Sequence, residues 1–445
     1  MADGYFVDAK YPDVAAALKA LGWHAVRHWT FPTCRLRYVN YAKVQWANVK
    51  PNVIINHLHH AVLLSQKHEL LAHLQRRPSI HAIFPRSVTS PDAWIPLFLY
   101  AQALLVLKNP AAFANHVTTA LTIGAEIQRQ NPRPSYARIH GLQMMDVKFL
   151  SDNEAALRPF FVMLPRTPTY EAVDADIQTA IDGILSHLEA CDRQFHFVST
   201  RNLWIAKPSG LSQGRGIELV TSLAEIHSVW AATGTPMVVQ QYIERPLLIM
   251  GRKFDIRQWV LVTDVAPVVI YWYKSCYLRF SATDYCVAHD EALRDKTMHL
   301  CNNSVQKHVS APAHHDIPEH MWPLQRFQQH LQEIGREEVW VERLCPAMQY
   351  ACVEAIESVA SKLRRVGKGF EWLGLDYIID EAFNVWLLEV NVSPDVSHST
   401  HTTAALVPEA TKDMLALILH NDETRGWQRL DLDAVAAHGS QHCAA

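Results

Sequence analysis

The spacing of apolar residues divides this chain into regions of different predicted structure. Residues 1–90 hold two strand-like runs, at 5–7 and 53–56, and a helix over 14–21 that Gly22 would end. This mixture predicts a small N-terminal α/β domain. Residues 91–200 are rich in alanine, leucine and isoleucine at helical spacing, with prolines marking the loops between helices.

Short strands are predicted from residue 203 onward. They fall at 203–207, 217–220, 237–241, 254–263, 268–274 and 277–280, and helices are predicted near 323–334 and 348–363. Ser222 with Glu225 three residues later is typical of a capped helix between the second and third strands. We therefore expect an α/β (α+β) chain with an N-terminal domain at 1–90, a central domain at 91–243, a C-terminal domain at 244–425 and a loose tail at 426–445.

One predicted strand carries its charges on a single face. Side chains of a strand alternate between faces, so Lys253, Asp255 and Arg257 point one way while Phe254 and Ile256 point into a core. Taken alone, such a face is usually solvated, because antiparallel sheets often keep one side in water. A second charged strand pair, near the C-terminal end, changes that interpretation.

A hairpin in this second region is predicted to bring three oxygen-bearing side chains together. A two-residue loop at 382–383 would set Asp376 directly opposite Glu389, with Cβ atoms about 4.5–5.5 Å apart. Asn391 shares that face. Charges inside strongly apolar strands are costly unless they are paired or bind metal. Two carboxylates and an amide suit Mg²⁺, which usually carries substrate phosphates, so we predict an ATP-dependent enzyme.

The glycine-containing loop at 208–216 is predicted to cover a triphosphate. It joins two strands and has neither a Walker sequence nor a dinucleotide fingerprint. Backbone N–H groups of such a loop can hold phosphate oxygens, and Lys207 at its base would meet them. An ordinary hairpin can also carry a Gly-Arg-Gly turn, so Lys207 and Arg215 are informative only beside the charged strands.

Composition limits the other functions. The 445 residues carry a net charge of −3, which gives no global attraction to nucleic acid or anionic membranes. Eight scattered cysteines without zinc spacing fit free thiols in a reducing compartment. The longest apolar stretch, 94–107, is too short to span a bilayer and is expected to form a buried helix. We expect a soluble, cytosolic protein without a secretory signal.

Five motifs follow one another between residues 200 and 400. They are Lys207-Pro208 with Arg215-Gly216-Ile217, then Val239 to Leu248, Lys253 to Arg257, Leu300 to Lys307, and Leu388 to Asn391. In this order they resemble the tubulin tyrosine ligase-like family. Residues 243–249, 300–308 and 321–327 are most similar to its glycine-ligating branch. The chain departs from that branch at Leu211, at Gln213 and after Asn391, which bears on the substrate more than on the nucleotide.

The resemblance implies an ATP-grasp fold with a small N-terminal α/β domain, a central domain whose strand–loop–strand unit covers ATP, and a C-terminal catalytic domain. The residues that it implies around ATP are Lys207, Arg215, Gly216, Gln240, Gln241, Tyr242, Ile243, Lys253 and Asp255. It implies Mg²⁺ ligation by Asp376, Glu389 and Asn391. Arg257 and Arg279 would face the γ-phosphate and the reacting carboxyl, with Asn302 nearby.

The implied reaction ligates free glycine to glutamate side chains of tubulin tails through an acylphosphate, as a chain-initiating step. The corresponding expectation is a monomer that acts on microtubules in the cytoplasm, at the axoneme of a cilium or flagellum, without nucleic-acid or membrane partners. Candidate docking cations for the acidic tail are Arg76-Arg77 with Arg86, Arg133 with Arg138, and Arg364-Arg365 with Lys368.

Two alternatives stay open at this point. The same fold could add glutamate instead of glycine, because amino-acid choice depends on the shape of a pocket that spacing does not reveal. The chain could also be a catalytically silent microtubule-binding protein. Lys207, Lys253, Asp376, Glu389 and Asn391 are all present, which argues against a silent protein.

Overall fold

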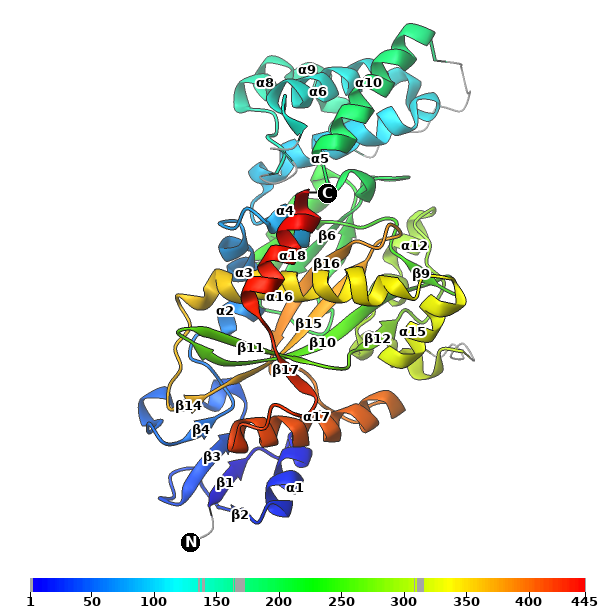
Figure 1. The fold of residues 1–445 in the computed structure, drawn as a ribbon. Coiled ribbons are helices and arrows are strands. Elements are labelled where there is room, and N and C mark those ends of the chain that lie inside the picture. The colour runs from blue at the N-terminus through cyan, green and yellow to red at the C-terminus, as the bar shows by residue number, and fades with distance from the viewer. Residues whose placement is uncertain are drawn as a thin grey trace.

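Three β-sheets lie one after another along the length of the molecule, with a layer of helices at one end (Figure 1). The computed structural model describes residues 3–444 except 135–136, 138–140, 163, 165–172, 308 and 310–315. Helices and strands are mixed along the chain, so the predicted α+β class is confirmed.

The N-terminal sheet is parallel and takes one strand from the C-terminal half of the chain. Its strands in spatial order are β14 (Lys368–Gly369), β4 (Ile54–Ile55), β3 (Cys34–Tyr38), β1 (Gly4–Val7) and β2 (His24–Ala25). Helix α1 (Pro12–Ala20) packs against α17 (His401–His420). The predicted 1–90 domain thus shares its sheet with a strand of the predicted C-terminal domain.

A helical layer and an antiparallel sheet follow. The helices are α5 (Pro91–Lys108), α6 (Val117–Gln130), α8 (Val147–Asp152), α9 (Glu154–Leu157) and α10 (Ala175–Cys191). The apolar run at 94–107 forms the buried helix that was predicted, α5. Among the described residues, no helix combines the length and apolar character needed to cross a membrane.

The antiparallel sheet contains the predicted strand–loop–strand unit. Its strands in spatial order are β5 (Ser87–Val88), β8 (Met237–Gln241), β6 (Trp204–Pro208) and β7 (Glu218–Val220), flanked by α11 (Leu223–Thr233). Ser222 caps α11 as predicted, since its hydroxyl accepts from the Glu225 backbone N–H at 3.3 Å. The glycine-containing loop joins β6 to β7.

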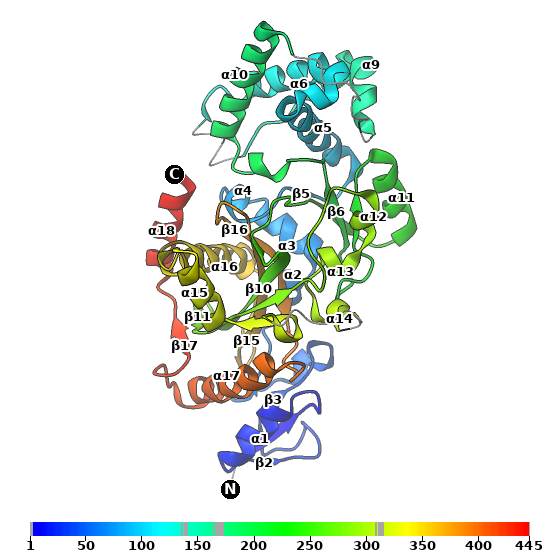
Figure 2. The same cartoon turned by 90° about the vertical axis from the view of Figure 1, so that its right-hand side faces the viewer.

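The largest sheet is built around β10 (Arg252–Val265), the longest strand that the structure describes. Its other strands are β9 (Leu248–Ile249), β11 (Val268–Tyr273), β12 (Tyr277–Phe280), β13 (Met321–Pro323), β15 (Glu371–Ile379), β16 (Val385–Val392) and β17 (Trp427–Arg429). Figure 2 shows α15 (Leu324–Glu333), α16 (Cys345–Ala360) and α18 (Leu432–Ala444) on one side of this sheet. On the other side are α11, α12 (Asp290–Arg294), α13 (Lys296–His299) and α14 (Asn303–Gln306).

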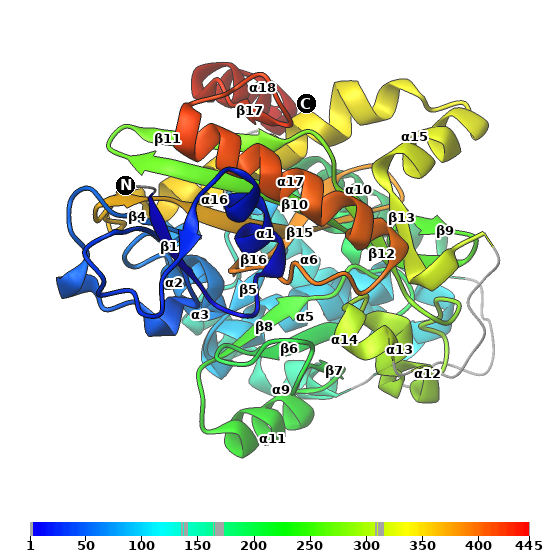
Figure 3. The same ribbon diagram turned by 90° about the horizontal axis from the view of Figure 1, so that it is seen from below.

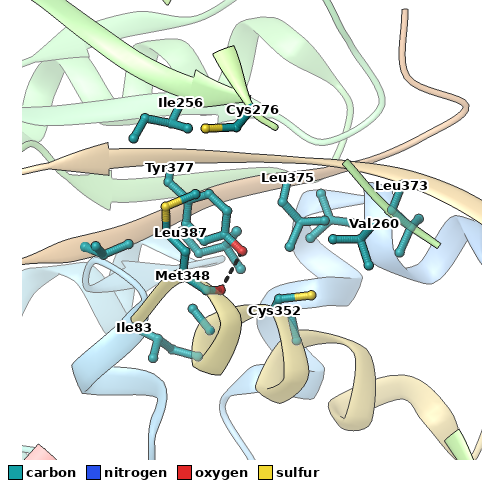
Figure 4. Close-up of a cluster of buried hydrophobic side chains, with 14 of the residues drawn as sticks. Ile83, Ile256, Val260, Cys276, Met348, Cys352, Leu373, Leu375, Tyr377 and Leu387 are labelled. Atoms are coloured by element: carbon teal, nitrogen blue, oxygen red, sulfur yellow. Dashed lines mark hydrogen bonds between the residues drawn. The ribbon is translucent and has the colours of Figure 1, made fainter. Parts of the chain in front are cut away.

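The main core lies between this sheet and α16 (Figure 4). Ile256 of β10 and Leu375 and Tyr377 of β15 meet Met348 on the predicted apolar stripe of α16. The Tyr377 hydroxyl donates to the Met348 carbonyl at 2.8 Å, so the one polar atom of that ring is satisfied inside the core. Phe254 lies in the same core, as strand alternation predicts.

The opposite face of β10 is divided between an apolar half and a charged half. Trp259 and Leu261 pack with residues of α17 and of the N-terminal sheet. Asp255 and Arg257 lie on the same face, nearer the N-terminal end of β10, and are also buried. Figure 3 shows α17 on one side of β15 and β16 in that view and β6 and β8 on the other. The charged half of the face is therefore turned toward the β6–β8 sheet and not toward α17.

The prediction of a loose tail at 426–445 is wrong. β17 pairs with β11, and α18 packs along α16. Trp427 is 1% exposed and lies against the rings of Tyr273 and Trp372. Burying the Trp427 side chain contributes several kcal/mol at about 25 cal/mol per Å², and Leu430, Leu432 and Val435 pack against the main core as well.

The turn between β15 and β16 has three residues, 381–383, so the predicted two-residue loop is wrong. The Asp380 N–H donates to the Asn384 carbonyl at 3.0 Å and closes the turn, in which Phe383 takes a φ of 60°. The buried Asp380 carboxylate holds the turn together. It accepts from the N–H groups of Ala382 and Asn384, from the Asn384 amide and from the Trp386 indole at 3.0 Å.

We expect Asp380→Ala to lower the free energy of unfolding by about 2–3 kcal/mol, because it leaves the buried Trp386 indole N–H and two turn amides without an acceptor. Urea denaturation measures the change. Glu381→Ala in the same turn is the control. It removes only a surface ion pair with Arg245 and should change stability by less than about 0.5–1 kcal/mol. Equal losses in the two variants would contradict this role of Asp380.

Candidate active site

A pocket lies between the β6–β8 sheet and the charged half of the β10 face. Most of the predicted site residues line it, namely Lys207, Gln240, Gln241, Tyr242, Ile243, Lys253, Asp255, Asn302, Asp376 and Glu389. Arg257, Arg279 and Asn391 stand behind these residues and bond to the pocket carboxylates. The structure therefore brings together segments from residue 207 to residue 391.

A β-bulge at Leu388 sets which side chains of the acidic hairpin face the pocket. Tyr377 pairs with Leu387, but the next residue back, Asp376, pairs with Glu389. The extra residue compensates for the three-residue turn, so Asp376 faces Glu389 as predicted. A bulge also lets two successive side chains point to one face. Both Leu388 and Glu389 line the pocket, whereas Leu387 enters the main core.

Strand pairing places acids and bases opposite one another. Arg257 is opposite Asp376 in the β10–β15 pair, and Asp255 is opposite Arg279 in the β10–β12 pair. Nε and Nη2 of Arg279 contact the two oxygens of Asp255 at 2.6 and 2.8 Å. Nε and Nη2 of Arg257 bond in the same way to Asp376, the second at 3.0 Å.

The two pairs form a single ionic cluster. Nη2 of Arg279 also lies 2.9 Å from Asp376, and all four side chains are less than 10% exposed. Burial raises the pKa of Asp376, but Arg257 and Arg279 outweigh it and hold that pKa below its usual range. Burial raises the pKa of Asp255, although Arg279 opposes the shift. Asp376 is therefore a carboxylate over the whole physiological range.

The three predicted metal ligands lie together. The Asn391 amide nitrogen lies 3.3 Å from Asp376 Oδ2 and 3.4 Å from Glu389 Oε1, and it also donates to the Gly374 carbonyl. The described residues contain no group of three or more His, Cys, Asp or Glu that could hold a metal ion, so the third candidate ligand here is an amide. A 180° flip of the Asn391 amide would turn its oxygen toward the two carboxylates. Two carboxylates and an amide oxygen fit a hard cation such as Mg²⁺.

Two buried lysines line the pocket. Lys207 Nζ donates to Gln240 Oε1 at 2.5 Å, and burial lowers the pKa of Lys207 to about 7. Lys253 donates to the Tyr242 hydroxyl and to the His299 carbonyl, both at 2.9 Å, and burial lowers its pKa. Burial and Lys253 lower the pKa of His299 to about 4, so its neutral ring can accept from the Tyr242 hydroxyl.

Two further pocket residues gave no signal in the sequence. Lys67 at the start of α3 (Lys67–Leu74) lies 3.5 Å from Glu389 Oε2 and donates to the Leu211 carbonyl at 3.2 Å. His299 is the last residue of α13 and lines the pocket. Neither belongs to a charged strand or a glycine loop, and only tertiary folding brings them to the site. A lysine beginning a short helix is otherwise typical of a solvated surface.

The loop at 208–216 is held from both sides. The Ser209 hydroxyl accepts from the His68 N–H at 2.8 Å, and Ser304 of α14 donates to the Gln213 carbonyl at 3.2 Å. Arg215 and Gly216 are not among the residues that line the pocket. Arg215 is exposed, and Gly216 has a φ of 69°, where a Cβ would lie 2.9 Å from the Pro208 ring. These two residues shape the loop.

The chemistry of the pocket fits an adenine nucleotide. One end is walled by Ile205, Ile217 and Ile243, and the other by Lys207 and the acidic hairpin. Nε2 of the buried Gln241, in the wall of the apolar end, has no hydrogen-bond partner within the protein. A ligand with a flat apolar ring that accepts hydrogen bonds, and with an anionic tail that carries a metal, matches both ends.

Comparison with known proteins places this pocket in context. A family model described as the tubulin-tyrosine ligase family matches residues 144–425. The chain is 38% identical over 257 residues to tubulin monoglycylase TTLL3 of Homo sapiens, covering 56% of this chain and 32% of that protein. It is 35% identical over 277 residues to protein monoglycylase TTLL8 of Homo sapiens, covering 59% and 32%. It is 36% identical over 231 residues to tubulin glycylase 3A of Drosophila melanogaster, covering 51% and 23%.

These matches span about a third or less of the length of each relative. The family match begins within the helical layer and includes the β6–β8 sheet, the loop over the pocket and the whole acidic hairpin. The pocket residues from Lys207 to Asn391 therefore all lie within the matched segment.

We expect nucleotide binding to take up a proton above pH 7. In the free protein Lys207 loses its proton near that pH, and phosphate oxygens favour the ammonium form. We take Lys207 to be fully protonated in the complex. With a pKa near 7 in the free protein, Lys207 should then take up about 0.9 proton at pH 8 and about 0.1 proton at pH 6. Calorimetry with a Mg²⁺–ATP analogue, in buffers of different ionisation enthalpy, measures the uptake.

Lys207→Met should abolish most of this uptake at pH 8. Lys307→Met, which removes an exposed lysine outside the pocket, is the matched control and should retain it. Undiminished proton uptake by Lys207→Met would show that another group takes up the proton.

Proposed function

This chain belongs to the tubulin-tyrosine ligase family, and we propose that it is an ATP- and Mg²⁺-dependent ligase that adds glycine to glutamate side chains of tubulin tails. One observation carries the proposal. Asp376, Glu389 and Asn391 converge beside Arg257 and Arg279 at the anionic end of a pocket that fits a nucleotide. The relatives that are named glycylases support glycine as the amino acid.

Each group has a distinct task in the proposed reaction. Mg²⁺ held by Asp376, Glu389 and Asn391 would neutralise charge on the triphosphate. Lys207 and Lys253 hold phosphate oxygens. Arg257 and Arg279 present planar guanidinium groups that suit both the γ-phosphate and the acceptor carboxylate.

The γ-phosphoryl group then passes to that carboxylate, and the free amine of glycine attacks the acylphosphate and expels phosphate. Such chemistry depends on positioning and charge neutralisation and needs no covalent protein nucleophile. We propose that Asn302, which lines the pocket beside Gly214 of the loop, contacts the reacting groups.

Salt bridges already neutralise several of the predicted docking cations. Arg77 bonds to Glu354 and Glu357, Arg86 bonds to Asp192, and Arg365 bonds to Asp264. Arg138 lies outside the described residues. The exposed cations that remain from the three candidate sets are Arg76, Arg133, Arg364 and Lys368. We propose that an acidic tubulin tail docks through cations of this kind, because they are the ones accessible to it.

The proposal includes a cellular setting. A ligase for tubulin tails acts on microtubules, so we place the protein on the cytoskeleton, at the axoneme of a cilium or flagellum, as a monomer that initiates glycine chains. Co-sedimentation with microtubules and localisation in ciliated cells test this part independently of the chemistry.

Incubation with tubulin, Mg²⁺–ATP and either labelled glycine or labelled glutamate tests the reaction. We expect glycine incorporation, located by mass spectrometry on glutamate side chains of the tails. Incorporation of glutamate alone would reject glycine and favour a glutamate ligase of the same fold. Absence of Mg²⁺–ATP binding in calorimetry would reject the enzyme altogether.

We expect Glu389→Gln to reduce ligation by about 10²-fold or more, because it removes one metal-binding charge without changing shape. Stability should change little, since the Glu389 side chain is 26% exposed and pairs, among the residues that the structure describes, with Lys67 alone. Glu381→Gln, on the exposed turn of the same hairpin, should retain full activity. Activity of Glu389→Gln close to that of the unaltered protein would remove Glu389 from the metal site.

A further inference from the structure

The ammonium group of Lys253 is held by two uncharged oxygens. Lys253 is buried and lines the pocket. A lysine ammonium has three hydrogens. In the described part of the chain, Lys253 donates one to the Tyr242 hydroxyl and one to the His299 carbonyl, both at 2.9 Å. Because the ammonium is tetrahedral, these two bonds fix the direction of the third hydrogen, which is left for a ligand in the pocket.

The Tyr242 hydroxyl can accept from Lys253 only when its own hydrogen points elsewhere. Two neighbours could receive that hydrogen. Nδ1 of His299 lies 2.9 Å from the hydroxyl, and the Tyr285 hydroxyl also interacts with it. The Tyr285 hydroxyl donates to the Glu244 carbonyl at 2.9 Å, so it has a hydrogen bond whether or not Tyr242 donates to it.

The other nitrogen of the His299 ring fixes which of the two carries the hydrogen. Nε2 lies 2.9 Å from the Ala292 carbonyl of α12, and a carbonyl only accepts, so Nε2 is the donor. Burial and Lys253 lower the pKa of His299 to about 4, and the ring is therefore neutral at neutral pH. Nδ1 is then an acceptor. If Tyr242 donated to Tyr285 instead, Nδ1 would be a buried acceptor without a donor, which is unfavourable.

We propose that His299 is a positioning residue for the nucleotide: its Nδ1 takes the hydrogen of the Tyr242 hydroxyl, so that this hydroxyl accepts from Lys253 and Lys253 presents its third hydrogen to the anionic ligand. The inference rests on the proposed function and adds to it a residue that acts through two others. Without an acceptor at Nδ1, the Tyr242 hydroxyl can turn its hydrogen toward Lys253, where two donors would then face each other.

Two amide substitutions separate the two nitrogens of the His299 ring. The side-chain amide of asparagine reaches about as far as Nδ1, and that of glutamine reaches about as far as Nε2. His299→Asn therefore keeps an acceptor for Tyr242 and loses the contact with Ala292, whereas His299→Gln does the reverse. Calorimetry at neutral pH measures the affinity of each variant for a non-hydrolysable ATP analogue with Mg²⁺.

We expect His299→Gln to bind the analogue about 10-fold more weakly, because a hydrogen bond to a charged group is misdirected, and His299→Asn to stay within about 3-fold of the unaltered protein. His227→Gln, which replaces an exposed histidine of α11 outside the pocket, is the control and should change nothing. Equal affinities of the two His299 variants, or weaker binding by His299→Asn, would overturn the proposal, because the ring would then act through Ala292 or not at all.

Tyr242→Phe removes the hydroxyl through which His299 acts. It should weaken binding of the analogue as much as His299→Gln does, and the two substitutions together should cause no further loss. A further loss of equal size in the double variant would show that His299 acts independently of Tyr242 and would overturn the proposal. Urea denaturation checks that each variant is folded. Should His299→Gln not fold, unchanged affinity in Tyr242→Phe would by itself overturn the proposal.

The two proposals fail in different ways. If the unaltered protein binds no Mg²⁺–nucleotide, both the ligase and the positioning role are wrong. If it binds Mg²⁺–nucleotide and ligates glycine, but His299→Asn and His299→Gln bind the analogue alike, only the positioning role is wrong.

Discussion

The site depends on burying opposite charges in register across paired strands. β10 lies between β12 and β15, and its alternation places Asp255 and Arg257 on the face that meets Arg279 and Asp376. Any one of these charges would be very costly alone at this depth, whereas a bidentate, hydrogen-bonded pair offsets most of that cost. The main core on the other face of β10 and β15 fixes the register, because a slip by one residue would exchange the two faces.

The N-terminal unit is joined to this arrangement by a second buried pair. Nδ1 of His57 bonds to Glu371 at 2.8 Å, and the N–H of Leu58 donates to the other oxygen of the same carboxylate. Glu371 begins β15, the strand that carries Asp376. The N-terminal sheet therefore has two links to the C-terminal half of the chain, strand β14 and the His57–Glu371 pair. These links fix the position of Lys67, which follows that sheet in the chain, relative to the acidic hairpin.

The sequence was sufficient for those parts of the site that depend on local periodicity. Alternation along β10 predicted which charges share a face, and the apolar flanks of Asp376 and Glu389 indicated that these carboxylates are buried or bind metal. The pairing of Asp376 with Glu389 is confirmed, although the turn has one residue more than predicted. The bulge at Leu388 adds one residue to β16 and so restores the predicted register. A bulge leaves no sequence signature here, since Leu388 suits either face.

Other parts were beyond local reasoning. Lys67 acts at the site only because α3 abuts the loop after β6, a contact between residues far apart in the chain. The tail after residue 425 was expected to be loose because its composition is polar, although Trp427 anchors it against Tyr273. The resemblance assigns Arg215 and Gly216 to ATP, and in this structure neither residue lines the pocket.

The attachments of the loop over the pocket have a consequence for access to it. Ser209 and Leu211 bond to His68 and Lys67 at the start of α3, which comes from the N-terminal side of the chain, and Gln213 bonds to α14, which comes from the C-terminal side. The nucleotide proposed to bind in this pocket would lie beneath a loop that two distant parts of the chain hold in place. Because these contacts come from both sides, movement of the loop requires several hydrogen bonds to break together.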